Sequence, residues 1–279
     1  MSRFRFVRQS LLMLSLPVIA TGLFAQIAAS AEYKPQVGQS GKDVEWVPTC
    51  QVLVDKMLDM AKVTPDDYVI DLGSGDGRTV ITAAKRGARA LGIEYNPDMV
   101  ALSKRNAAKE GVTDKAQFIE ADLFESDFSK ATVITMFLMP RINLRLRPRI
   151  LDLKPGTRIV SNTFTMGEWT PDQTFVVEGN EDCGKYNTAL FWIVPAKVEG
   201  TWKLSQEELQ LVQSFQRIAG RIKSATDSVA IMNGNLNGDE ISFSAGRVSY
   251  IGHVNGSVMQ GTLRFGGQVT EWNATRVGR

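Results

Sequence analysis

From Thr64 onward, short apolar runs alternate with segments whose apolar positions recur at helical spacing. The runs predict strands at residues 68–72, 90–94, 116–120, 132–138, about 157–164 and 191–194. The intervening segments predict helices at residues 78–86, 97–110 and 140–154, and CQVLVDKMLDMAKV predicts one more before the first strand. Because buried strands that alternate with amphipathic helices form parallel sheets, we expect an α/β, Rossmann-like, doubly wound domain over residues 49–197.

The pattern changes after Pro195. Short alternating runs follow, and the Asn-Gly pairs at 233, 237 and 255 stand between them. Asn and Gly tolerate the positive φ angles of tight hairpin turns, so residues 198–279 predict a small antiparallel β-rich domain, open or partly closed as a barrel. Its alternation is typical of an ordinary two-sided sheet rather than of a ligand-binding lining.

The first 31 residues carry three arginines and no acid, followed by an uncharged apolar stretch that ends in Ala29, Ser30 and Ala31. This order is typical of a secretory signal peptide cleaved after Ala31. The uncharged run also approaches the roughly 20 residues that cross a bilayer, so an inner-membrane anchor at residues 11–31 is the alternative. In either case we expect a periplasmic or secreted folded part, preceded by an extended arm at residues 32–48.

Charge and residue usage exclude several classes of function. Without residues 1–31 the chain has 29 basic and 30 acidic residues, which gives no global case for nucleic-acid binding. His253 is the only histidine, so histidine-based hydrolase triads and multi-histidine metal centres are disfavoured, and we expect no metal. Cys50 and Cys183 are the only cysteines, and one disulfide or two buried free thiols are both compatible with their spacing.

The stretch VIDLGSGDGR places Gly73, Gly75 and Gly77 at alternate positions between a predicted strand and a predicted helix. Because glycine has no Cβ, the backbone of such a turn can approach a ligand closely. The spacing differs from the G-x-G-x-x-G fingerprint of dinucleotide sites. Asp71 and Asp76 would repel a pyrophosphate, whereas they would pair with the ammonium group of a methionine moiety. The turn therefore favours S-adenosylmethionine.

Two further acids follow the next predicted strands. Glu94 ends the second strand, where an acid bonds the ribose hydroxyls of a bound adenosine, and Asp122 follows the third, near the adenine amino group. Taken singly, Glu94 could be a solvated strand end and Asp122 an N-cap. Because the carboxyl ends of successive parallel strands share one edge, three acids there indicate a single ligand site.

DLGSGDGR, GIEYNP and ADLF resemble the first three cofactor motifs of class I (seven-strand, Rossmann-like) S-adenosylmethionine-dependent methyltransferases. The first motif is most similar to a lysine-methyltransferase-like branch, which includes mitochondrial enzymes acting on lysines of inner-membrane proteins. The likeness covers roughly residues 46–195. Members of the branch carry a His-Asp pair near Asn162, where this chain has SNTFT. The resemblance implies a cofactor site of Asp71, Gly73, Ser74, Gly75, Asp76, Gly77, Glu94 and Asp122.

The methyl acceptor is expected beyond the fourth strand. Its candidate residues are Thr135, Phe137, Pro140, Asn143 and Trp169. Phe137 and Pro140 would form an apolar slot for the acceptor chain, although ordinary packing at a strand end is the commoner role of such residues. Arg141, Arg145, Arg147 and Arg149 would attract an acidic protein surface or lipid headgroups, or form a solvated helix face.

These features predict an S-adenosylmethionine-dependent methyltransferase whose acceptor is most simply a protein lysine. In-line displacement at a sulfonium depends on positioning and needs no metal. Glycine spacing and the loop acids disfavour a nicotinamide-dependent oxidoreductase. An exported binding protein that kept the fold and lost the activity is the alternative that the leader segment raises. These features are compatible with proximity to a membrane, and they specify neither the individual acceptor nor the oligomeric state.

Overall fold

The computed structural model describes Met1 and residues 33–278. Apart from Met1, the expected signal peptide or anchor therefore lies outside the described residues. Within the described part of the chain, no helix has the length and apolar character needed to cross a membrane.

Seven strands form one sheet in the order β3-β2-β1-β4-β5-β7-β6. Strands β1 to β5 pair in parallel, whereas β7 runs antiparallel to both of its neighbours. The strands are β1 (Tyr68–Leu72), β2 (Arg89–Glu94), β3 (Ala116–Glu120), β4 (Val133–Met136), β5 (Arg158–Asn162), β6 (Gln173–Val176) and β7 (Thr188–Ile193). The expected doubly wound, mostly parallel sheet is thus confirmed.

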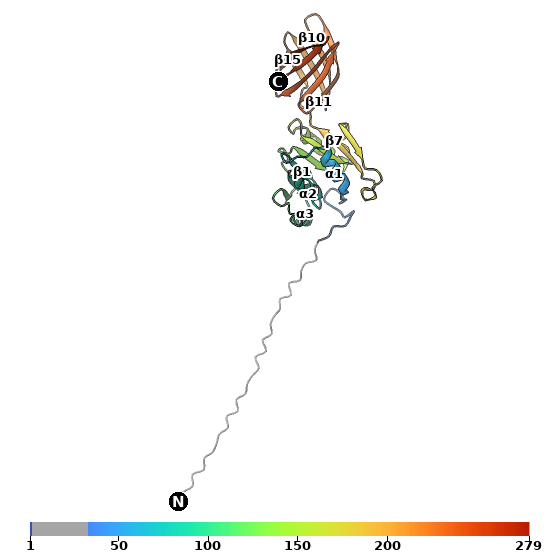
Figure 1. The fold of residues 1–279 in the computed structure, drawn as a ribbon, viewed down its shortest axis with the longest axis vertical. Helices are drawn as coiled ribbons and strands as arrows, with labels where there is room; N and C mark the ends of the chain where they lie inside the picture. Colours follow the sequence, from blue (N-terminus) through green and yellow to red (C-terminus); the bar gives the residue numbers. More distant parts are fainter. Residues whose placement is uncertain (2–32, 279) are drawn as a thin grey trace. The chain divides into compact units, whose positions relative to one another are not determined.

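Helices cover both faces of this sheet. Successive residues of a strand point to opposite faces, so two neighbouring residues of β1 pack against different helices. Val69 of β1 belongs to a core cluster with α1 (Gln51–Met60), α2 (Arg78–Lys85) and α3 (Pro97–Lys109). Its neighbour Ile70 belongs to a second cluster with α4 (Pro140–Leu151). Figure 1 shows α1, α2 and α3 beside the strands of the sheet.

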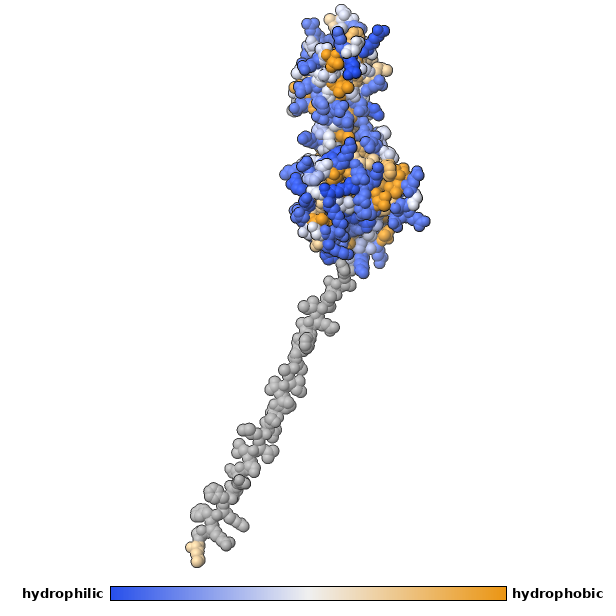
Figure 2. Space-filling view, viewed as in Figure 1, coloured by the Kyte–Doolittle hydropathy of each residue, from blue (hydrophilic) through white to orange (hydrophobic). Residues whose placement is uncertain are grey.

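The sheet differs from the sequence prediction in the bounds of three strands and in one additional strand. β5 ends at Asn162 rather than near residue 164, and β7 begins at Thr188 rather than at Phe191. β4 ends at Met136, so Phe137 and Leu138 lie in the connection that follows it rather than in the strand. β6 was not predicted, because its four residues are all exposed and carry no alternation. Figure 2 shows a largely hydrophilic surface with local apolar patches, and Phe175 and Val176 of this edge strand are among the exposed apolar side chains.

The second domain is an eight-stranded antiparallel barrel that is closed rather than partly open. Its strands are β8 (Gly200–Leu204), β9 (Glu207–Ser214), β10 (Arg217–Lys223), β11 (Ser228–Asn237), β12 (Glu240–Ala245), β13 (Val248–Asn255), β14 (Val258–Phe265) and β15 (Gln268–Arg276). Closure comes from β8, which pairs with both β9 and β15. Figure 1 shows the strands β10, β11 and β15 of this barrel. Because Trp202, Met259 and Trp272 help fill a continuous buried core, the barrel is a packed module.

One of the three Asn-Gly turn predictions is wrong. Asn237-Gly238 and Asn255-Gly256 fall at the ends of hairpins, but Asn233-Gly234 lies inside β11. The strand register shifts there, between Met232 and Asn235, and Asn233 has a φ of 55°. The same tolerance of positive φ that suits Asn to a turn also suits it to a β-bulge, so the dipeptide alone does not distinguish the two.

Candidate active site

A cavity of about 470 Å³ opens where the parallel strands end. Its wall includes residues that directly follow β1, β2, β3 and β4, with Gly73, Tyr95, Ala121 and Phe137 as examples. The strand order reverses between β1 and β4, and crevices at such a switch point are where open α/β sheets bind ligands.

The three glycines of the turn all have positive φ angles. Gly73, Gly75 and Gly77 have φ values of 76°, 54° and 84°, in the left-handed region that favours glycine. A Cβ at Gly77 would lie 2.7 Å from the ring of Phe118, so this glycine serves packing against β3. Gly77 is also the one predicted cofactor residue that does not line the cavity.

Two polar side chains of α3 donate hydrogen bonds to backbone carbonyls of the glycine turn. The hydroxyl of Ser103, which is completely buried, donates to the Gly75 carbonyl at 2.8 Å. Asn106 donates from its side-chain amide to the Asp76 carbonyl at 2.9 Å. α3 itself begins at Pro97, with the side chain of Asn96 accepting from the backbone of the first turn. Sequence reasoning did not find these two supports, because their partners are 28 and 30 residues away in the chain.

Asp71 is the buried carboxylate of the site. Burial, together with the nearby Glu94 and Asp76 charges, raises its pKa to about 7, against the opposing effect of the hydrogen bond from Thr135. Within the described residues, no basic side chain forms an ion pair with Asp71. Asp76, in contrast, forms an ion pair of 2.6 Å with Arg78. Of the two acids predicted near the turn, Asp71 is therefore the one suited to a cationic ligand group.

Glu94 and Asp122 lie on the same cavity wall. The carboxylate of Glu94 accepts backbone N–H groups from Gly75 at 2.9 Å and Asn96 at 3.0 Å, one on each oxygen. A carboxylate oxygen has a second lone pair, so Glu94 can still accept hydroxyl donors. Asp122 accepts from Lys42 at 2.5 Å, and this hydrogen bond holds the pKa of Asp122 below its ordinary value.

The arm before α1 forms part of the cavity, a role that its sequence had not indicated. Lys42 of the arm stacks its ammonium 4.2 Å from the ring of Tyr95 in addition to pairing with Asp122. Trp46 packs on the glycine turn, since a Cβ at Gly75 would lie 2.7 Å from the Trp46 Nε1. The predicted extended arm is thus an ordered wall of the site.

Three aromatic rings form another part of the wall. Phe137, Phe164 and Tyr186 all line the cavity. Their ring centroids are 5.1 Å apart for Phe137 and Tyr186, and 5.9 Å apart for both other pairs. Phe137 was predicted from the sequence. Phe164 and Tyr186 were not, because they follow β5 and precede β7, far along the chain from the glycine turn.

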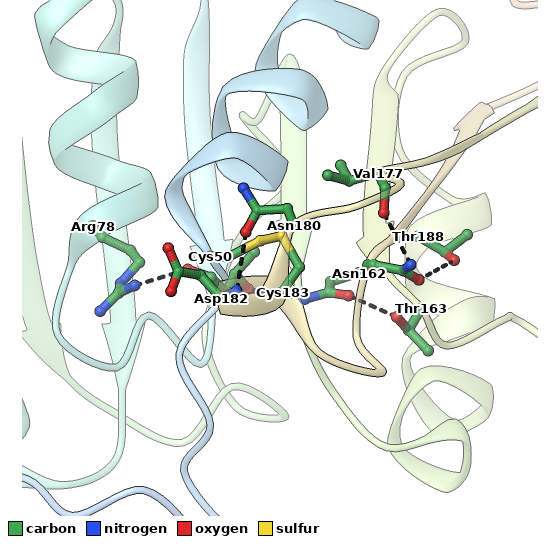
Figure 3. The surroundings of a disulfide bond; sticks show 11 residues. Cys50, Arg78, Asn162, Thr163, Val177, Asn180, Asp182, Cys183 and Thr188 are labelled. Carbon is green, nitrogen blue, oxygen red and sulfur yellow. Dashed lines mark hydrogen bonds between the residues drawn. A yellow bond between two sulfur atoms is a disulfide. The ribbon is translucent and has the colours of Figure 1, made fainter.

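A disulfide joins Cys50 to Cys183, three residues before Tyr186 (Figure 3). Cys50 is the N-cap of α1, and Cys183 ends the short helix η1 (Glu181–Cys183) in the connection between β6 and β7. The Cα atoms are 5.0 Å apart across 133 residues of sequence. Of the two states that the spacing allowed, the structure therefore has the disulfide, and among the described residues no free cysteine is left.

The other acceptor-site candidates lie away from the cavity lining. Thr135 is buried and donates to Asp71, and Asn143 is buried with its side-chain amide bonded to the Phe164 and Thr165 carbonyls. Pro140 is exposed at the start of α4. Trp169 is buried and stacks 5.9 Å from Phe215 of the barrel. Only Phe137 of the five candidates lines the cavity.

The predicted arginine cluster of α4 makes contacts within the chain. Arg149 donates to the Phe124 and Ser126 carbonyls, and Arg147 donates to Met166 and pairs with Glu168 at 2.9 Å. Arg145 stacks on Phe124, and Arg141 donates to the Asp43 carbonyl. The four guanidinium groups therefore hold the arm and two connections against α4.

Comparison with known proteins shows the family of the chain. Residues 71–173 match the family described as ANTKMT methyltransferase domain. A protein-lysine N-methyltransferase of Saccharolobus islandicus is 45% identical over 48% of this chain and 86% of its own length. The adenine nucleotide translocase lysine N-methyltransferase of Mus musculus is 31% identical over 55% of this chain, which spans 62% of that relative.

A solved structure matches at the level of the fold and of the sequence. It is described as an RNA methyltransferase from Salinibacter ruber in complex with S-adenosyl-L-homocysteine. It is 45% identical, with a TM-score of 0.51, and the match covers 55% of this chain and 96% of that one. These matches favour an enzyme over an inactive binding protein that kept the fold.

Proposed function

We propose, from the premise that the chain belongs to the lysine-methyltransferase-like branch of class I S-adenosylmethionine-dependent methyltransferases, that it methylates the side-chain amine of a protein lysine. The family settles the methyl donor, and the acceptor is the proposal. The lysine methyltransferase names of two relatives support it, and so does the charge of the cavity.

The residues present fit the methyl donor. Asp71, a buried carboxylate with no basic partner in the described chain, suits the donor's ammonium group. Glu94 has acceptor capacity for ribose hydroxyls, and the bare backbone of Gly73 and Gly75 allows close approach. S-adenosylmethionine supplies a methyl group on a positively charged sulfur that becomes a neutral thioether when the methyl leaves.

The single observation that carries the amine acceptor is the charge of the cavity wall. Its acidic residues are Asp43, Glu45, Asp71, Asp76, Glu94 and Asp122, and its basic residues are Lys42, Arg78 and Arg141. Two of the bases are already paired, Lys42 with Asp122 and Arg78 with Asp76. With Asp71 and Glu94 facing the donor, Asp43 and Glu45 remain against Arg141. This acidic excess attracts an ammonium group and repels a phosphodiester backbone.

The aromatic part of the wall also favours the neutral, reactive form of the lysine amine. A lysine ammonium must lose a proton before its nitrogen can attack, and a desolvating apolar surface lowers the pKa of an amine. Phe137, Phe164 and Tyr186 supply such a surface. The N–C bond then forms as the C–S bond breaks, and the released proton passes to solvent. The chain contributes chiefly by aligning the two reactants.

We also propose that the mature chain works outside the inner membrane. Residues 1–31 have the order of a signal peptide, and a disulfide such as Cys50–Cys183 persists in oxidising compartments. Fractionation of cells, followed by sequencing of the N-terminus of the mature protein, tests this directly. A chain that keeps residues 1–31 in the membrane fraction is anchored, and one found in the cytoplasm contradicts the proposal.

Labelled methyl transfer tests the acceptor. Purified protein is incubated with S-adenosylmethionine carrying a radioactive methyl group, in parallel with a protein extract and with total RNA from the same cells. We expect label in protein, with mass spectrometry placing one or more methyl groups on lysine. Glu94→Ala protein is the matched negative control. Label in RNA and none in protein would overturn the lysine proposal.

A further inference from the structure

The turn that carries Tyr186 is tied to the cofactor side of the cavity by a covalent link. Tyr186 lies three residues beyond Cys183, and its backbone N–H donates to the Cys183 carbonyl at 3.0 Å. The disulfide connects this turn to Cys50, whose neighbour Thr49 lines the cavity. The turn that carries Tyr186 is thus covalently linked to a residue that precedes Cys183 by 133 positions in sequence.

Hydrogen bonds fix both ends of this link. Thr49 accepts from Arg78 of α2 at its carbonyl, at 2.8 Å, and from Asn162 of β5 at its hydroxyl, at 3.1 Å. Figure 3 shows Arg78 and Asn162 on opposite sides of the disulfide. On the other strand of the connection, Asn187 donates from its side-chain amide to the Val177 carbonyl at 3.0 Å. The base of the Tyr186 turn is therefore held on both sides.

The face of the Tyr186 ring already accepts an ammonium group. Lys185 places its Nζ 5.0 Å from the centre of this ring. Tyr186 is half-buried and lines the cavity, whereas Lys185 is exposed and does not. The ring therefore offers the cavity an apolar contact surface whose electron-rich face attracts positive charge. Phe164 completes the cluster, and its carbonyl is held by Asn143 at 3.2 Å.

We propose that Tyr186 is a specificity-determining residue that guides the acceptor lysine into the cavity, and that the Cys50–Cys183 disulfide holds it in place through the turn between them. The proposal rests on the proposed function, because it assigns the acceptor side of the same site. Phe137 and Phe164 contact the aliphatic part of the lysine, and Tyr186 receives its ammonium end before the proton is lost.

This arrangement selects a long cationic side chain. The three rings are tilted or offset against one another, with interplanar angles of 21°, 58° and 65°. They therefore present edges and partial faces, which suit a narrow methylene chain better than a flat base that stacks face to face. The excess of acidic over basic residues in the cavity wall also favours a positively charged side chain.

Two variants of Tyr186 test the role of the ring. Tyr186→Ala removes the contact surface, whereas Tyr186→Phe keeps the ring and loses only the hydroxyl. The binding of S-adenosylhomocysteine is measured by calorimetry, and methyl transfer is measured with radioactive donor and the protein extract. We expect Tyr186→Ala to lower transfer about tenfold and to leave the dissociation constant of S-adenosylhomocysteine unchanged, with Tyr186→Phe close to the parent protein.

The double variant Cys50→Ser, Cys183→Ser tests the link. It is assayed below its own thermal midpoint, with stoichiometric S-adenosylhomocysteine binding as the check on folding. We expect transfer to fall about as far as in Tyr186→Ala. When Tyr186→Ala is added to the double variant, we expect no further decrease, because residues that act through one another are not additive.

The outcomes separate this proposal from the proposed function. Parent protein that binds S-adenosylhomocysteine but labels no protein contradicts the proposed function. If the parent labels protein and Tyr186→Ala transfers at the parental rate, the acceptor role of Tyr186 is wrong. Loss of S-adenosylhomocysteine binding in Tyr186→Ala would place Tyr186 in the cofactor site instead, and independent, additive losses would show that the disulfide does not act through Tyr186.

Discussion

Thr135 donates a hydrogen bond of 2.7 Å to Asp71, its direct partner in the pairing of β4 with β1. The two strands meet where the strand order of the sheet reverses. Thr135, a predicted acceptor-site residue, is completely buried and supports Asp71, a predicted cofactor-site acid. The bond favours the charged form of a carboxyl that burial otherwise neutralises.

Cofactor binding should therefore depend on pH around neutrality. An ionised Asp71 pairs with the donor's ammonium group, and a protonated one does not. With a pKa of about 7, the affinity for S-adenosylhomocysteine should fall about fivefold between pH 7 and pH 6. Calorimetry across this range measures the change. An affinity that stays constant down to about pH 5 would show that Asp71 remains ionised or does not contact the ligand.

Thr135→Val should move this pH dependence upward. The Thr135 hydroxyl lowers the pKa of Asp71, so its removal raises that pKa and shifts the loss of affinity to higher pH. Thr135→Ser keeps the hydroxyl and serves as the control. A weaker affinity with an unshifted pH midpoint would assign Thr135 a packing role only.

Asp71→Asn should stabilise the ligand-free protein at alkaline pH. The pKa of Asp71 is raised in the folded state, so folding favours the protonated form, and stability is lost as pH rises from about 4 to about 7. Asparagine avoids this loss and still accepts from Thr135. We expect a higher thermal midpoint than the parent at pH 8, little difference at pH 4, and no cofactor binding.

The control for this experiment is Asp114→Asn, at an exposed acid between α3 and β3. Its thermal midpoint should follow that of the parent at both pH values. Equal stabilisation by the two substitutions would attribute the effect to net charge rather than to the burial of Asp71.

Gly75→Ala should abolish cofactor binding. Gly75 has a φ of 54°, and an added Cβ would lie 2.7 Å from the Trp46 Nε1, so both the turn and the arm must shift. Gly111→Ala is the matched control, because Gly111 has a φ of 69° with no atom near its Cβ position. We expect the control to lose about 1 kcal/mol of unfolding free energy and to bind normally. Equal losses of S-adenosylhomocysteine affinity in the two variants would contradict the contact.

Trp169→Leu should lower stability and spare the chemistry. Trp169 is completely buried, stacks on Phe215 of the barrel and accepts from the Trp192 indole at its carbonyl. Loss of a large buried ring costs about 3 kcal/mol. Urea unfolding and methyl transfer, measured on the same preparation, separate the two effects. Folded Trp169→Leu protein that binds cofactor but transfers no methyl group would return Trp169 to the acceptor site.

The sequence predicted the strands and helices of the sheet because their patterns are local. Periodicity located β1 and β3 to the residue, and the glycine turn with its acids followed from the order of strand, turn and helix. Seven of the eight predicted cofactor residues line the cavity for this reason. The edge strand β6 was not predicted, because all four of its residues are exposed and its apolar residues show no periodic pattern.

The sequence by itself determined the class of fold and the edge of the sheet that holds the cofactor residues, since both depend on residues close together in the chain. Only the tertiary structure decided the aromatic part of the cavity wall, the pairing of Cys50 with Cys183, the place of the arm over the glycine turn and the closure of the barrel. Each of these depends on contacts between segments far apart in sequence, and composition and spacing carry no record of which distant segments meet.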